Sequence, residues 1–146
     1  MCLRLLASFV VVVILAPSAW AENQIMFAQN EPLTGQRSFC AVVSNFRGLT
    51  KNYRADSFWL AVRFSRDVPY SVKVNGKLVK SKDDGTLNET DFDNSNGDNI
   101  TVTVTRDGQY QFDVNVTAPV KKFTLALNWF NEAASTFSIR KTSCSK

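Results

Sequence analysis

The chain has 146 residues, 45% of them hydrophobic and 21% charged, with a formal net charge of +4 and no histidine. This composition is typical of a folded protein with one hydrophobic core, and not of a disordered or fibrous chain. The absence of histidine excludes Ser-His-Asp and Cys-His nucleophile activation and every zinc site that needs an imidazole ligand.

The N-terminus has the pattern of a secretory signal. Arg4 precedes an apolar run at residues 5–16, which is too short to cross a bilayer, and residues 19–21 form an A-x-A cleavage site. We therefore expect residues 1–21 to be a signal peptide cleaved after Ala21, so that the mature protein is secreted or periplasmic; an uncleaved anchor is the alternative. No later segment has the apolar length of a membrane span, and export argues against a nucleic-acid partner.

Residues 22–36 show no clear hydrophobic period and contain Pro32 and Gly35. We predict an extended N-terminal arm for this segment, followed by one β-domain at residues 37–146. After signal cleavage two cysteines remain, Cys40 and Cys144. An even cysteine count in an exported chain predicts one disulfide between them, and an intermolecular bond or free thiols are the alternatives.

A basic loop with aromatic neighbours follows the first predicted strand. Candidate binding residues in this loop are Arg47, Lys51, Tyr53 and Arg54. Further lysines flank the Asn75-Gly76 turn. Such patches fit an anionic glycan, an anionic lipid surface or an acidic protein partner. The alternative is a solvated face with lysines that protect an edge strand.

Strict alternation of apolar and polar residues recurs along the chain and predicts half-buried antiparallel strands. We expect about eight strands, near residues 38–45, 57–65, 69–74, 77–81, 99–106, 109–117, 121–130 and 135–142. Asn75-Gly76 and Asp107-Gly108 are signals for two-residue hairpins. The fold class is therefore all-β, an antiparallel two-sheet β-sandwich that is Ig-like in a loose sense and has one disulfide, with a small barrel as the alternative.

The most polar stretch of the chain is "TDFDNSNGDNI" at residues 90–100. Its oxygen-bearing residues Asp91, Asp93, Ser95 and Asp98 lie at near-alternate positions, a spacing that could hold calcium, which prefers oxygen ligands. However, an EF-hand register that starts at Asp91 has Asn96 where glycine is required and Val102 where glutamate is required. We therefore favour an exposed strand connection and expect no cofactor, with calcium as the alternative.

Aromatic residues supply a second set of candidate binding residues. Trp59 falls on the polar face of its predicted strand, and Trp129 and Phe130 are neighbours, so that one of the two points away from the core. Flat aromatic side chains can stack on sugar rings or anchor a protein partner. The alternative for Trp59 is burial against another part of the chain.

The sequence favours a non-enzymatic function. Two carboxylates alone can serve a glycosidase, but the carboxylates of this chain cluster in one polar loop or alternate outward along strands. We expect an exported recognition domain that binds an extracytoplasmic protein partner or an anionic glycan through surface aromatics and loops. An inhibitor of a secreted hydrolase and a structural subunit of an envelope or matrix assembly are the alternatives.

Overall fold

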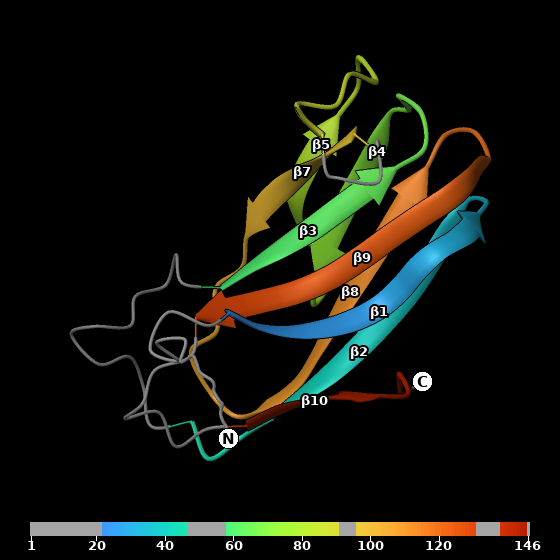
Figure 1. The fold of residues 1–146 in the computed structure, drawn as a ribbon. Helices are drawn as coiled ribbons and strands as arrows, with labels where there is room; N and C mark the ends of the chain where they lie inside the picture. Colours follow the sequence, from blue (N-terminus) through green and yellow to red (C-terminus); the bar gives the residue numbers. More distant parts are fainter. Residues whose placement is uncertain (1–21, 47–57, 91–95, 131–137, 146) are drawn as a thin grey trace, which may run out of the picture.

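The computed structural model describes residues 22–46, 58–90, 96–130 and 138–145. Within these residues the chain forms ten β-strands and no helix. Figure 1 draws the strands as arrows. The strands are β1 (Glu22–Leu33), β2 (Gln36–Ser44), β3 (Phe58–Phe64), β4 (Tyr70–Val74), β5 (Lys77–Lys82), β6 (Glu89–Thr90), β7 (Asn96–Thr101), β8 (Gly108–Val116), β9 (Val120–Phe130) and β10 (Ser138–Thr142). The all-β prediction is confirmed.

The strands form two antiparallel sheets. The first sheet has the strand order β1-β9-β3-β7-β6, and the second has the order β10-β2-β8-β4-β5. The two sheets lie in separate layers, with β1, β9 and β3 in one and β2, β8 and β4 in the other (Figure 1). Both sheets are open at their edges, so the described strands form a β-sandwich and no closed barrel.

Strand β3 shows how the sequence produces this layering. Its burial alternates without interruption, with Phe58, Leu60, Val62 and Phe64 fully buried between the sheets. Because successive side chains of a strand point to opposite faces, this spacing gives the strand one apolar face. Removing each such side chain from water stabilises the fold by about 1.5–3 kcal/mol.

The inner faces of the two sheets interlock through aromatic rings. Phe64 of β3 stacks on Phe123 of β9, with ring centroids 5.5 Å apart, and lies 5.1 Å from the ring of Tyr70 on β4 in the other sheet. Phe39 of β2 lies 6.0 Å from Phe123 and adds a second contact between the layers. Tilted and offset ring pairs of this kind stabilise the core beyond the area that they bury.

The segment predicted as an N-terminal arm is part of the sandwich. Residues 22–33 form β1, which pairs with β9 at the edge of the first sheet and buries Phe27, Ala28 and Leu33. The register of β1 shifts between Met26 and Ala28 and at two later points. Each bulge interrupts the two-residue period, which is why the strand gives no clear alternation in the sequence.

Only one of the two predicted hairpins is present. Asn75 and Gly76 both have positive φ, 51° and 82°, and join β4 to β5 as the type I′ signal predicts. The prediction for Asp107-Gly108 is wrong, because the strands on either side, β7 and β8, belong to different sheets. Asp107 instead accepts hydrogen bonds from the backbone N–H groups of Asn45 and Phe46, at 3.1 and 2.6 Å.

Candidate binding site at the β5 edge

On one side of the sandwich, an edge of the first sheet lies near an edge of the second. β5 is one of the two edge strands of the second sheet. In the first sheet, β7 pairs with the two-residue strand β6 only at Asn96 and Gly97. Beyond β7 the chain runs on beside β3, where the N–H of Val102 donates to the carbonyl of Phe58 at 2.9 Å. β5 and residues 101–106 therefore both border this side of the molecule.

A buried polar bridge joins the sheets at one end of this side. Asp98 of β7 is only 4% exposed and points into the sandwich. It accepts hydrogen bonds from the Tyr70 hydroxyl at 2.6 Å and from Nδ2 of Asn88 at 3.0 Å. The ammonium of Lys82 on β5 lies 3.9 Å from Oδ1 of the same carboxylate. The carboxylate is thus compensated by two donors and one cation, as a buried charge must be.

The bridge changes the acidity of Tyr70. Burial, followed by the hydrogen bond to Asp98 and the negative charge of that carboxylate, raises the pKa of the phenol well above its usual value. Each of these effects disfavours the phenolate. Tyr70 is therefore a neutral hydrogen-bond donor at physiological pH, and its surroundings do not suit it to act as a base.

Arg63 secures the strands beside this bridge. Its guanidinium donates to the carbonyls of Val62 and Asp98, each at 3.1 Å, and to Oδ1 of Asn99 at 3.2 Å. It lies across Gly97, where an added methyl group would sit 1.9 Å from the carbonyl oxygen of Val62. The absence of a side chain at position 97 is therefore a condition for the packing of β3 against β7.

At the other end of β5 the sheets enclose a cleft of about 330 Å³ that is open to solvent on one side. Its lining combines two cations, the hydroxyl groups of three threonines and a tyrosine, one side-chain amide and three valines. It comprises Val74, Asn75, Lys77, Val79, Thr101, Val102, Thr103, Thr105, Arg106 and Tyr110. None of these lining residues is an acid, a histidine or a cysteine. The cleft therefore has hydrogen-bond donors for an anionic or hydroxylated ligand.

Two anchors hold the walls of the cleft. The hydroxyl of Tyr110 donates to the carbonyl of Arg106 at 2.9 Å and accepts from the backbone N–H groups of Thr105 and Arg106. This tyrosine thus fixes the crossing from one sheet to the other, as corner tyrosines do in other β-sandwiches. On the opposite wall, Oδ1 of Asn75 accepts from the N–H of Gln111 at 2.9 Å and ties the tip of the β4–β5 hairpin to β8.

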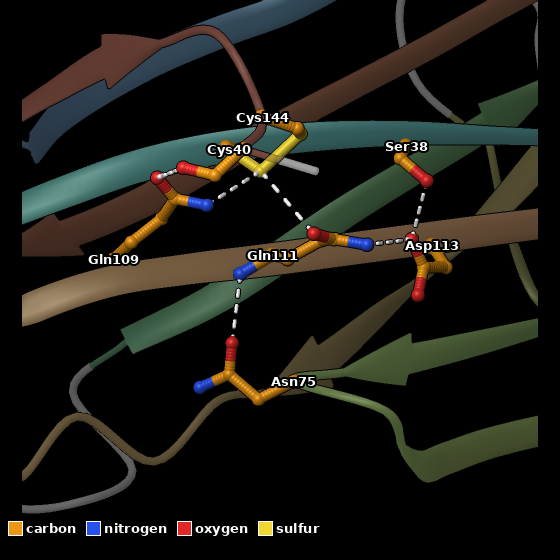
Figure 2. Close-up of a disulfide and its surroundings, with 8 residues drawn as sticks. Ser38, Cys40, Asn75, Gln109, Gln111, Asp113 and Cys144 are labelled. Carbon is orange, nitrogen blue, oxygen red and sulfur yellow. Dashed lines mark hydrogen bonds between the residues drawn. A yellow bond between two sulfur atoms is a disulfide. The ribbon is translucent and has the colours of Figure 1, made fainter.

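Figure 2 shows this second anchor beside the disulfide. Cys40 of β2 and Cys144, which follows β10, are bonded with their Cα atoms 5.1 Å apart, so the predicted pairing is confirmed. Along β8, Nε2 of Gln111 donates a hydrogen bond to Oδ1 of Asp113, which also accepts one from the hydroxyl of Ser38 on β2. The disulfide and this polar row lie on the outer face of the second sheet.

β5 itself carries the most exposed large apolar side chains of the described residues. Leu78 is 53% exposed and Val79 is 38% exposed. Lys77 and Lys80 flank them on either side, because the strand reads KLVKSK. An edge strand with exposed apolar side chains presents unpaired backbone groups to any chain that approaches it.

The predicted aromatic residues lie elsewhere. Trp59 is half buried on the outer face of the first sheet, where it pairs with Thr101 and Asn128. Trp129 is partly buried and packs against the hydrophobic core. Phe130 ends β9, and its side chain lies outside the described part of the structure, as do Arg47, Lys51, Tyr53 and Arg54.

Of the four proposed calcium ligands only Asp98 is described. Its carboxylate points into the sandwich and takes part in the bridge to Tyr70. Asp91, Asp93 and Ser95 lie outside the described residues. Among the residues that the structure does describe, no three histidine, cysteine or acidic side chains come together as a metal site. Calcium binding by this loop stays the alternative to an exposed strand connection.

Sequence reasoning missed the bridge and the wall formed by residues 101–106. One signal for the bridge was present, because counting back by two from Val102 and Ile100 places Asp98 on the buried face. A charged residue at a buried position of a strand requires a partner, although the pattern does not name it. No comparable signal marks Arg106 as a neighbour of Lys77.

Comparisons with protein-family models, with curated proteins and with solved structures found no match to this chain. The described residues also contain no helix with the length and hydropathy needed to cross a bilayer. The fold itself shows a β-sandwich with one disulfide, and the cleft lies beside the edge strand β5 of this sandwich.

Proposed function

We propose that the protein is an exported, non-catalytic recognition domain that binds a protein partner along β5 and the adjoining cleft. The observation that carries this proposal is the exposure of Leu78 and Val79 on an edge strand. Water-exposed apolar side chains and open backbone groups both gain when another chain covers them.

The rigidity of the site supports the same function. The cleft walls are held by Tyr110 and Asn75, and the far end of β5 is held by the bridge from Lys82 to Asp98. A surface that is ordered before binding loses little conformational entropy when a partner arrives. The lining contains no aspartate, glutamate, histidine or cysteine side chain, so binding is the role that it supports best.

Site-specific photo-crosslinking tests this proposal. A photoreactive phenylalanine derivative replaces Val79 in one variant and the exposed Lys121 of β9 in a matched control. We expect a discrete crosslinked product at position 79 in cells of the source organism, and none at position 121. Equal labelling at the two positions, or no product at position 79, would reject the β5 edge as the binding surface.

The cleft favours a second candidate function, the binding of an anionic glycan. Lys77 and Arg106 line the same opening as three threonine hydroxyls, which suits sulfate or carboxylate groups on a sugar chain. Retention on an immobilised polyuronate or sulfated polysaccharide, with loss of retention for Lys77→Gln/Arg106→Gln, is the expected result for this function. Unchanged retention of that double variant would exclude the cleft as the glycan site.

A further inference from the structure

We infer that the partner segment is an extended, acidic peptide that adds as a further antiparallel or parallel strand to the outer edge of β5. This inference rests on the proposed function and specifies the chemistry of the partner. It is carried by three features of the described residues: the open backbone edge of β5, the lysines along it, and the cations of the adjoining cleft.

In the described part of the chain, the outer backbone edge of β5 is not covered by another strand. β5 pairs with β4 from Lys77 to Lys82 and has no strand on its other side among the described residues. Six residues of edge offer enough backbone donors and acceptors for several ladder hydrogen bonds to an incoming strand. Recognition by strand addition uses these main-chain bonds for affinity and the flanking side chains for specificity.

Two lysines of this edge lie on the core side of β5, and one of them, Lys77, lines the cleft. Lys77 and Lys80 lie opposite Val74 and Val72, whose side chains point toward the core side of the sheet. No ion pair to either lysine is found among the described residues, whereas Lys82 is engaged by Asp98. Arg106 adds a further cation on the facing wall of the cleft.

The positive charge beside β5 determines which kind of strand can add to its edge. An uncharged strand would cover the lysine stems and remove water from the ammonium groups without compensating them. A strand with aspartate or glutamate at the cleft-facing positions supplies that compensation, and opposite charges on neighbouring strands attract. Acidic side chains are therefore expected at alternate positions, with apolar or β-branched residues beside Leu78 and Val79.

The same lysines disfavour a second copy of this chain as the occupant. If β5 paired with β5 of another molecule in antiparallel register about the strand centre, Lys77 would face Lys82 and Lys80 would face Val79. Six lysines would then lie along one pair of strands, three from each copy, and like charges placed close together destabilise pairing. The occupant is a different chain, with the opposite charge.

Peptide selection against the mature, disulfide-intact protein tests the inference even though the partner is unidentified. A displayed library of random peptides about a dozen residues long is selected for binding, and the bound sequences are read. Their affinities are then measured for three proteins: the wild type, Lys77→Glu/Lys80→Glu, and the control Lys121→Glu/Lys122→Glu. The control makes the same change of charge at two exposed lysines of β9 outside the cleft.

We expect selected peptides to be enriched in alternating Asp and Glu and to protect the backbone amides of β5 from hydrogen exchange. Their affinity should fall by about tenfold or more for Lys77→Glu/Lys80→Glu and by less than about twofold for the control, because two attractive contacts become repulsive. The affinity of the wild type should also fall as the salt concentration rises.

The other outcomes separate the two proposals. Neutral peptides that protect β5 and bind the charge-reversed variant equally well would overturn the acidic partner and leave β5 as the binding edge. The absence of any selected peptide that protects β5 would overturn both. A polyuronate that binds through the lysines without protecting the β5 amides would replace strand addition by glycan binding.

Discussion

The hydroxyl of Tyr70 donates a 2.6 Å hydrogen bond to Oδ2 of Asp98 and joins β4 of the second sheet to β7 of the first. Both residues are almost completely removed from solvent, Tyr70 at 3% exposure and Asp98 at 4%. The bond ties the sheets together at the end of β5 that is remote from the cleft. Its loss should therefore be measurable as a change in stability.

The first prediction concerns the buried carboxylate. Asp98→Ala leaves the Tyr70 hydroxyl and the amide of Asn88 without their acceptor, so we expect the free energy of unfolding to fall by about 3 kcal/mol. Asp98→Asn keeps the shape of the side chain and one acceptor oxygen, so it should lower the free energy of unfolding by less than Asp98→Ala does. Urea denaturation measures both, with the exposed Asp67→Asn as a control that should change stability by less than about 0.5 kcal/mol. An Asp98→Ala protein as stable as this control would refute the bridge.

The second prediction concerns alkaline pH. Because the folded protein raises the pKa of Tyr70 above the ordinary value of 10.0, the unfolded chain releases this proton first as the pH rises. The contribution of Tyr70 to stability is thus fully present below about pH 10 and is lost progressively above it. We expect Tyr70→Phe to cost about 2 kcal/mol at pH 7 and less as the pH rises above 10.

Urea denaturation of the wild type and Tyr70→Phe between about pH 7 and pH 11 measures this difference. Taking the difference between the two proteins removes the titration of the other tyrosines and the lysines, which both share. If the difference in the free energy of unfolding between the two proteins stays constant across this range, the pKa of Tyr70 is the same in the folded and unfolded states.

The third prediction concerns two glycines with different roles. Gly97→Ala places a methyl group 1.9 Å from the carbonyl of Val62, so strands β3 and β7 must separate and the cost should be about 3 kcal/mol. Gly76→Ala meets no atom within 4 Å but sits at a φ of +82°, so it should cost only about 1 kcal/mol of backbone strain. Thermal melts give both values. The reverse order of stabilities would contradict the packing of β3 against β7.

The fourth prediction concerns the disulfide. The Cys40–Cys144 bond closes a separation of 104 residues, and in the chain-entropy model a loop of about 100 residues stabilises the fold by roughly 4.7 kcal/mol. Cys40→Ala/Cys144→Ala should therefore unfold at a much lower urea concentration than the wild type. Reductant should lower the midpoint of the wild type and leave that of the double variant unchanged. Insensitivity of the wild type to reductant would mean that the bond does not constrain the chain.

Much of the fold could be predicted from the sequence alone, because the alternation of apolar and polar residues that marks a strand is a local property of the chain. The runs that became β3, β8 and β9 each show which side chains face the core. The two cysteines outside the predicted signal peptide permit only one intramolecular pair. β1 was missed because its bulges break the period, and the hairpin at Asp107-Gly108 was wrong because turn chemistry does not say whether the following strand stays in the same sheet. Both errors concern the relation of a segment to the rest of the chain.

The candidate site depended on tertiary structure for the same reason. Alternation places Asp98 on a buried face, but it cannot say that Tyr70, 28 residues earlier and in the other sheet, is the partner. Likewise, Lys77 and Arg106 form one cleft only because β5 and the segment after β7 border the same side of the sandwich. In the strands that have a regular period, such as β3, β8 and β9, the sequence determined which side chains turn inward or outward, since that follows from backbone geometry. Which strands become neighbours was decided by the packing of the whole chain, since that pairing joins residues far apart in sequence.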